Sequence, residues 1–363
     1  MITVSTDLND KINQPRYWLN GLALAYSVVG YGFSIVCLGI SGSDRAWLFN
    51  IFGVALLTHT LVWAAYFIHE FMHGSIYRSP RWNALGAQIL LFLTGSCYCR
   101  YRPLARYHLA HHKNRTDFSS FSMSDFLRSL PAWLLKTIET LEWLYFPAIN
   151  FILRWFCALS PFLSKNRTSD RWRNGRLLFV RGALFAALAV YSWKAVLLYF
   201  VAYVCFINIL RFMDCFQHTY NVVQLGQPMP KYSPEYEERN TYSNLVVGNS
   251  RWVNLLFLNF GYHNAHHHVM YCPWYLLPQL DAEIYSAQCA QFVSLGSLVK
   301  NYHQFRMQRL FGQKSDVVET EDGLNFDGFY GDIGVSFLVL REPLDWLKIK
   351  TSQTADALEV AAS

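Results

Sequence analysis

The chain has 363 residues, of which 53% are hydrophobic, 17% aromatic and only 15% charged, with a net charge of +6. Soluble domains carry about 25% charged residues, so this composition argues against a water-soluble globule, and its apolar content argues against disorder. The eight cysteines are scattered without a CxxC pair, which argues against a disulfide framework, a zinc ribbon and an iron–sulfur cluster. The basic residues do not alternate with aromatic ones, so no nucleic acid partner is expected. A membrane protein is the prediction.

Two apolar runs lie near the N-terminus. Residues 1–16 are polar and include Asp7 and Asp10, so they lack the features of a cleaved signal peptide. Residues 21–40 carry no charge and are long enough as a helix to cross the hydrocarbon layer of about 30 Å. Residues 51–68 form a second run after a short polar turn. Together the two runs predict a membrane hairpin.

Two further apolar segments are not expected to cross the membrane. Residues 85–98 are too few for a full span and predict a re-entrant or interfacial segment. Residues 133–163 are rich in Trp, Phe and Leu but contain four charged side chains and Pro147, which favours an interfacial pair of amphipathic helices. If they crossed, the loop after them would lie outside the cell, although it holds six basic residues against the single acid Asp170. The positive-inside rule opposes that topology.

Residues 177–193 and 195–210 form a second predicted hairpin, joined at Lys194. Four crossings place both termini and all histidine clusters on the cytoplasmic side. We therefore expect an all-α, multi-pass integral membrane protein in which two hairpins carry a cytoplasmic helical cap. Residues 1–313 form its membrane domain and residues 314–363 a polar cytoplasmic C-terminal tail.

Nine of the twelve histidines follow a pattern. Within each cluster they are three or four residues apart, which places them on one face of a helix. Nine neutral imidazoles exceed the need of one four-coordinate metal and suit two ions of higher coordination number. The sequence therefore predicts a metal site built from HEFMH, HLAHH, CFQHT and HNAHH, with the ligands His69, His73, His108, His111, His112, His218, His263, His266 and His267.

The order HxxxH, then HxxHH 35 residues later, then a late HxxHH resembles the membrane fatty acid desaturase family over roughly residues 19–280. The resemblance implies a four-span helical protein with a cytoplasmic di-iron centre, in which two Fe ions, Fe²⁺ in the resting reduced form, use O₂ as co-substrate. His218 matches, by position, an additional ligand of that family. Asp214 precedes His218 by one turn, where related enzymes place a polar residue that reaches an iron through water.

Two other polar residues are candidates to orient a box histidine. Asn264 lies inside the third box and Asp117 follows the second. The alternative is that Asn264 is an exposed residue and Asp117 a helix-end acid. No separate catalytic acid or base is assigned.

HEFMH also satisfies HExxH, the signature of zinc metalloproteases, with Glu70 as the general base. An intramembrane protease would leave the second and third boxes without a role. A metal transporter would carry ionisable residues within several spans, and only His59 lies deep in a run. Both alternatives are weaker than an oxidase.

The expected function is O₂-dependent desaturation of a fatty acyl chain held among membrane lipid. A fatty acid hydroxylase and a fatty acid decarboxylase that forms terminal alkenes share the same histidine framework and stay open as alternatives. The chain contains no segment resembling a cytochrome b5 domain and no cysteine spacing suited to a ferredoxin domain. Electrons are therefore expected from a separate donor such as ferredoxin, rubredoxin or cytochrome b5 with its reductase.

Overall fold

The computed structural model describes residues 4–248, 250–285, 291–312, 317–321, 323–333, 336–339 and 347. In chain order, its longer elements are α1 (Thr6–Ile12), α2 (Tyr17–Gly39), α3 (Ala46–His73), α4 (Pro80–Leu93), α5 (Tyr101–Asn114), α6 (Met123–Ser129), α7 (Ala132–Trp143), α8 (Ala148–Leu163), α9 (Arg171–Tyr191) and α10 (Trp193–Asp214). After α10 come α11 (Pro234–Arg239), α12 (Arg251–Leu255), α13 (His263–His268), α14 (Leu277–Ile284) and α15 (Leu295–Gln304). The short elements are the strands β1 (Asp117–Ser119), β2 (Val222–Gln224), β3 (Val318–Thr320) and β4 (Gly323–Asn325), with the 3₁₀ turns η1 (Thr168–Asp170), η2 (Gln308–Phe311) and η3 (Ser336–Leu338).

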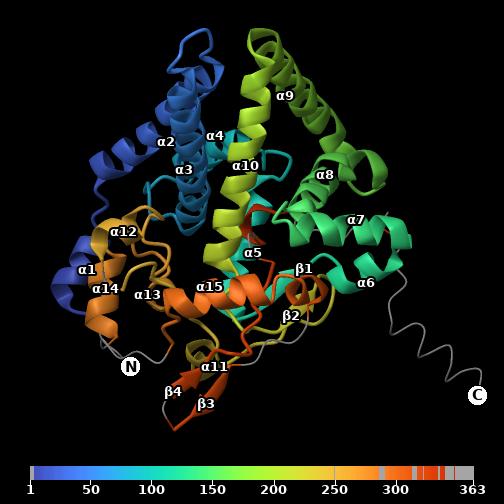
Figure 1. Cartoon of the computed structure of the whole chain (residues 1–363). Coiled ribbons are helices and arrows are strands. Elements are labelled where there is room, and N and C mark those ends of the chain that lie inside the picture. The colour runs from blue at the N-terminus through green and yellow to red at the C-terminus, as the bar shows by residue number, and fades with distance from the viewer. Residues whose placement is uncertain are drawn as a thin grey trace, which may run out of the picture.

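Four helices in the described chain are long and apolar enough to cross a membrane: α2, α3, α9 together with η1, and α10. They are consecutive in pairs, so they form the two predicted hairpins, and the predicted all-α membrane fold is confirmed (Figure 1). Large apolar side chains cover the outer surface of α9, where Phe179 is 77% and Val190 90% exposed. Such a surface suits lipid rather than water.

The helix α3 is longer than the apolar run that predicted it. The run covers residues 51–68, whereas the helix continues through His69 and His73 and ends at Gly74. Gly74 adopts a φ of 72°, a left-handed conformation that ends helices and costs glycine little. No residue before Gly74 breaks the helix, so the first histidine pair stands on a rigid extension of a spanning helix.

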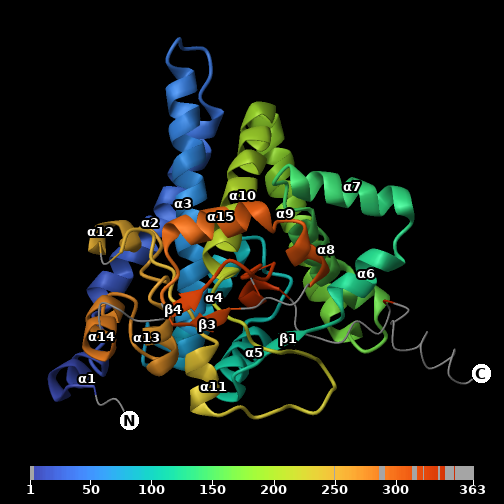
Figure 2. The same ribbon diagram turned by 60° about the horizontal axis from the view of Figure 1, so that its bottom comes forward.

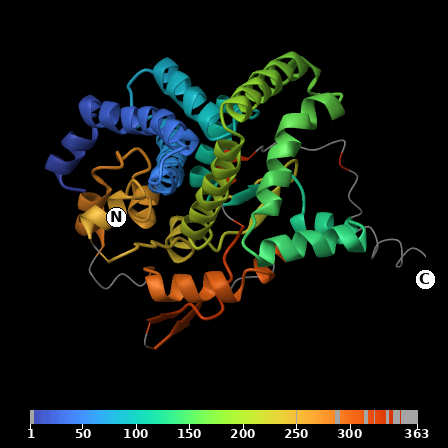
Figure 3. The same cartoon turned by 45° about the horizontal axis from the view of Figure 1, so that its top comes forward.

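The two segments that were not counted as spans form α4, and α7 with α8. Helix α4 has 14 residues and buries Ala87, Leu90 and Leu91. Helices α7 and α8 meet at 118°, and Pro147 stands at the start of α8. Figure 3 shows α7 and α8 in green, away from the blue α2–α3 hairpin, with α10 between them.

The chain after α10 folds into a cap of short helices at the lower ends of the spanning helices in Figure 1, and Figure 2 turns this cap toward the viewer. The cap is tied to α5 by a two-stranded parallel sheet in which Asp117 of β1 pairs with Val222 of β2. The same core cluster contains Phe67 and Phe206 from the spans and Phe260 and Trp274 from the cap. The cap and the membrane helices therefore share one core, which holds the histidines between them.

Part of the range assigned to a polar tail, 314–363, packs against this core. Strands β3 and β4 form an antiparallel hairpin in which Val318 pairs with Asn325. Phe329 is fully buried in the cap, and Phe337 and Leu338 join the central core. Apolar side chains in an otherwise polar stretch account for this docking. Residues 313–316, 322, 334–335, 340–346 and 348–363 lie outside the described chain.

Candidate metal centre

All nine histidines of the predicted set lie together, although they come from four separate segments. His69 and His73 stand at the end of α3, the HLAHH histidines on α5, His218 just after α10 and the HNAHH histidines on α13. Their ring nitrogens fall into overlapping groups within 4.8 Å: His69, His73, His108, His112 and His266; His111, His112 and His267; and His218, His263 and His267.

Five histidines form a first group around the end of α3. His73 Nε2 lies 3.4 Å from His69 Nε2 and 2.8 Å from His108 Nε2. His112 Nε2 lies 3.3 Å from His108 Nε2. The His266 ring completes the group, with its centroid 4.5 Å from that of His73 and 4.6 Å from that of His69. Three helices thus direct nitrogens toward a single point.

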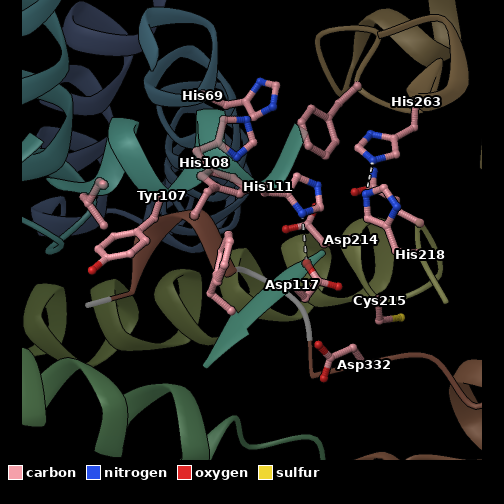
Figure 4. Close-up of a pocket in the computed structure, with 15 residues that line it drawn as sticks. His69, Tyr107, His108, His111, Asp117, Asp214, Cys215, His218, His263 and Asp332 are labelled. Atoms are coloured by element: carbon pink, nitrogen blue, oxygen red, sulfur yellow. Dashed lines mark hydrogen bonds and ion pairs between the residues drawn. The ribbon is translucent and has the colours of Figure 1, made fainter. Parts of the chain in front are cut away.

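Four histidines form a second group beside the first. His263 Nε2 lies 2.8 Å from His218 Nε2. The His218 ring centroid is 4.7 Å from that of His111 and 4.6 Å from that of His267. His112 connects the groups, since its ring centroid is 4.1 Å from that of His267. In Figure 4, His111 lies between the pair His69 and His108 and the pair His218 and His263.

Helical spacing explains why the histidines of α5 and of α13 are divided between the two groups. On α5, His108 and His112 are four residues apart and share a face toward α3, whereas His111 is turned toward His218. On α13, His266 faces the first group and His263 and His267 face the second. The short helix α13 therefore contributes histidines to both groups.

Five of the nine histidines are buried and the other four are partly buried, and burial disfavours the charged form of an imidazole. It lowers the pKa of His112, His263 and His267 well below the usual value. Burial, followed by the charge of His111, lowers the pKa of His218 and of His266 to about 3. A neutral imidazole is the form that binds a metal ion, because its lone pair is free.

Two carboxylates hold rings of the second group. His111 Nδ1 lies 3.1 Å from a carboxylate oxygen of Asp117. His267 Nδ1 lies 3.0 Å from a carboxylate oxygen of Glu237, whose other oxygen is 2.7 Å from Arg115 Nε. A carboxylate at Nδ1 places the ring proton there and leaves Nε2 free as a ligand. Glu237 lies 30 residues before His267 on the separate helix α11, and no motif in the sequence links it to the histidine boxes.

The other two polar candidates occupy different places. Asp214 lines the cavity between the histidines and accepts a hydrogen bond of 3.4 Å from the hydroxyl of Tyr66. Asn264 is buried, and its backbone N–H donates to Ser243 Oγ at 3.1 Å. Its carbonyl accepts from the Tyr285 hydroxyl at 3.4 Å. Asn264 therefore positions α13 through its backbone, whereas Asp214 faces the site.

The remaining three histidines lie outside these groups. His59 Nε2 is 2.9 Å from the carbonyl oxygen of Leu256, His303 Nδ1 is 2.5 Å from the Tyr145 hydroxyl, and His268 is exposed. These contacts give them structural or surface roles.

A cavity of about 70 Å³ lies against the histidines (Figure 4). Its apolar walls come from Leu104, Phe118, Phe260 and Phe337. It adjoins a second cavity of about 340 Å³, because Asp117, Phe118 and Asp332 line both. The histidines can thus be approached past Phe118 and the C-terminal segment.

The donor set fits two metal ions. Metal–imidazole bonds of about 2.1 Å at right angles put neighbouring nitrogens about 3 Å apart, close to the separations of 2.8 Å and 3.3 Å in the first group. His266 Nε2 and His267 Nε2 are buried and have no hydrogen-bond partner within the described chain. Buried polar atoms are normally satisfied, so these nitrogens are suited to a ligand outside the protein.

The carboxylate of Glu70 does not suit the role of a protease base. It accepts hydrogen bonds from Ser75 Oγ at 2.8 Å and from the Trp274 backbone N–H at 3.2 Å. These contacts hold it between α3 and the cap, and it is not among the residues that line the histidine cavity in the described chain. Glu70 therefore lies at the junction of α3 and the cap, beside His69, with its Oε1 3.5 Å from His69 Nδ1.

Comparison with known proteins agrees with this geometry. The family model described as "Fatty acid desaturase" matches residues 45–295, more than half of the chain. No curated protein and no solved structure gave a match. The matched segment contains all nine clustered histidines and three of the four candidate spans. The chain therefore belongs to the fatty acid desaturase family of membrane oxidoreductases.

Proposed function

We propose that this protein is a fatty acyl desaturase, which uses O₂ and two histidine-held iron ions to introduce a double bond into an acyl chain. The observation that supports this most directly is the clustering of the nine histidines, with five around the end of α3 and four beside them around His218. Imidazole ligands suit iron, and removal of hydrogen from an unactivated methylene requires a redox-active metal.

One ion would be held by His69, His73, His108, His112 and His266, and the other by His111, His218, His263 and His267, with Asp214 beside the second. When bound, the irons would supply the reduction of O₂ and the oxidising power. Burial favours the neutral form of His112, His218, His263, His266 and His267, because it lowers the pKa of each of these imidazoles. Asp117 and Glu237 fix the rings of His111 and His267. Buried ligands with fixed orientations are those that a redox centre requires.

The overall reaction breaks two C–H bonds on neighbouring carbons and forms one C=C bond. O₂ is reduced to two water molecules. The substrate supplies two hydrogens, and the remaining two electrons and two protons come from a separate donor and solvent. We propose a small electron-transfer protein as this donor: ferredoxin, rubredoxin or cytochrome b5 with its reductase.

The chain's apolar residues would hold the substrate. Phe118, Phe260 and Phe337 line the cavity against the histidines, and Phe337 is 5.7 Å from His69 between ring centroids. We propose that the acyl chain reaches the site through the adjoining cavity along Phe118, and that these rings exclude water from the reacting carbons. The site would face the cytoplasm, since the basic loop before α9 favours that side.

The product identifies the reaction. Membranes containing the protein are incubated with a series of labelled acyl substrates, O₂ and a reducing system, and the products are analysed by mass spectrometry. Desaturation predicts a product that has lost two hydrogens. A product that has gained oxygen, or one shortened to a terminal alkene, would overturn desaturation in favour of hydroxylation or decarboxylation. Metal analysis of the same preparation should find iron near two per chain, and one zinc per chain with peptide cleavage would refute the oxidase.

A further inference from the structure

A further cavity, separate from the two already described, opens on the lateral surface of the molecule between α8, α9 and α10. It has a volume of about 280 Å³ and shares no lining residue with the histidine cavity. Two arginines and a set of aromatic rings line it, including Arg154, Arg181, Tyr98, Phe185, Tyr199 and Tyr203. The cavity therefore combines two positive charges with an apolar, aromatic wall.

The two guanidinium groups have no acidic partner in the described part of the chain. Arg154 Nη1 donates to the Thr94 carbonyl at 3.2 Å and to Ser96 Oγ at 2.6 Å, and Arg181 Nη1 donates to the Phe92 carbonyl. Arg154 Nε is buried and has no hydrogen-bond partner among the described residues. A guanidinium has five N–H donors, so these carbonyl contacts leave donors free to bind an anion.

Satisfying carbonyls at the end of α4 does not by itself explain this arrangement. Arg173 performs that role for the next turn, donating to the Cys97 carbonyl at 2.5 Å, and it does not line the cavity. Arg154 and Arg181 instead place two positive charges in one cavity among aromatic rings. Placing a charge in apolar surroundings costs free energy unless an opposite charge or hydrogen bonds compensate for the lost water.

The position of the cavity indicates where the compensating charge comes from. The apolar run of α9 begins at Leu177, so Arg181 lies only one helical turn inside it, near the level of lipid headgroups. Trp155 is 56% and Phe200 44% exposed, and both line the cavity. A lipid in the surrounding leaflet can therefore reach the arginines from the side, with its tails along these apolar side chains.

We propose that this cavity binds the phosphate of an anionic phospholipid through Arg154 and Arg181. Arginine pairs with phosphate by charge-assisted, bidentate hydrogen bonds, and basic pockets between membrane helices bind such headgroups. The bound lipid bridges α8, α9 and α10. This site is independent of the reaction at the histidines.

The test uses the full-length protein purified in mild detergent and depleted of lipid. Binding of phosphatidylglycerol, phosphatidylcholine and palmitate is measured by native mass spectrometry, together with the thermal shift that each produces. The wild type should bind phosphatidylglycerol at least about tenfold more tightly than phosphatidylcholine, and R154Q/R181Q should lose that preference.

Two further variants separate binding from folding. Arg173 lies on α9, as Arg181 does, and bonds a backbone carbonyl outside the cavity. Arg173→Gln should therefore keep the preference for phosphatidylglycerol. Gly182→Leu keeps both charges but extends a side chain into the cavity, where an added Cβ meets no atom within 4 Å. It should abolish the preference while leaving the lipid-free unfolding temperature at or above that of the wild type.

Three results would overturn the proposal. They are an unchanged preference for phosphatidylglycerol in both R154Q/R181Q and Gly182→Leu, equal binding of phosphatidylcholine by the wild type, and palmitate bound in place of phospholipid. The last result would assign the cavity to a fatty acid carboxylate.

Discussion

At the scale of single residues, carboxylates at Nδ1 hold two imidazoles of the site. Asp117 and Glu237 both contact histidines of the second group, His111 and His267. In the first group, the carboxylate beside a ring is that of Glu70 on α3 itself, whose Oε1 lies 3.5 Å from His69 Nδ1. The two proposed ions should therefore respond differently to loss of a carboxylate.

We expect Glu237→Gln and Asp117→Asn each to weaken the binding of the second ion by about 10- to 100-fold, because losing a residue that orients a metal ligand lowers metal affinity by about that factor. Iron content should fall from near two toward one per chain, measured by elemental analysis after dialysis. Glu235→Gln is the matched control, since Glu235 is exposed on the same helix, and it should keep both irons. If Glu237→Gln lost both ions equally, the assignment of the histidines to two separate ion sites would be contradicted.

Neighbouring histidines on α13 provide a second residue-scale test. His266 is buried with an unsatisfied Nε2, whereas His268, two residues later, is exposed. His266→Ala should abolish acyl oxidation and His268→Ala should leave it near wild type, as measured by product formation in membranes at equal protein levels. Full activity of His266→Ala would remove that histidine from the site.

At the scale of elements, a buried ion pair joins α7 and α8 to α10. Arg211 of α10 contacts both carboxylate oxygens of Glu142 on α7, at 2.6 Å and 3.1 Å. The Ile149 backbone N–H also donates to Glu142 at 2.8 Å, across the bend into α8. This one carboxylate therefore fixes the angle between α7 and α8 and their position against α10.

Glu142→Ala should lower the free energy of unfolding by about 3–5 kcal/mol, because it leaves the Arg211 charge buried without its partner. Thermal unfolding of the protein in detergent measures the loss. Glu139→Ala on the same helix removes only a partly exposed contact, 3.7 Å from Lys136, and should cost no more than about 1 kcal/mol. Similar unfolding temperatures for the two variants would show that the buried pair does not hold α7.

At the scale of the whole molecule, the orientation proposed in the membrane makes the loop between α2 and α3 external and the cap internal. In a Cys205→Ser background, which removes the exposed cysteine of α10, Ser43→Cys should react with an impermeant maleimide in intact cells. Lys231→Cys, which is exposed in the cap, should react only after lysis. The opposite pattern would invert the topology.

Acid should destabilise the metal-free protein as a whole. The pKa of His218 and of His266 is about 3 in the folded chain, against about 6.5 when unfolded. Between these values the unfolded chain binds more protons, so the free energy of unfolding falls as the pH drops below about 6.5. The unfolding temperature of chelator-treated protein should decrease from about pH 7 to about pH 4. An unchanged temperature across that range would show that these rings are not buried neutral.

Local pattern was enough to predict the four spans and the eight histidines of the three boxes. Apolar runs of helical length and histidines three or four residues apart are properties of short segments, so the spacing within HEFMH, HLAHH and HNAHH already places them on common helix faces. Family resemblance added His218, which has no cluster of its own.

The tertiary structure alone decided how the histidines are shared and what surrounds them. It joins His266 to the first group and His111 to the second, sets Glu237 against His267, and folds Phe337 of the expected tail onto His69. These residues are far apart in the chain, and their contacts depend on the crossing of α3, α5, α13 and the C-terminal segment. A local sequence pattern records which face of a helix is apolar or carries histidine, but not which distant segment packs against that face.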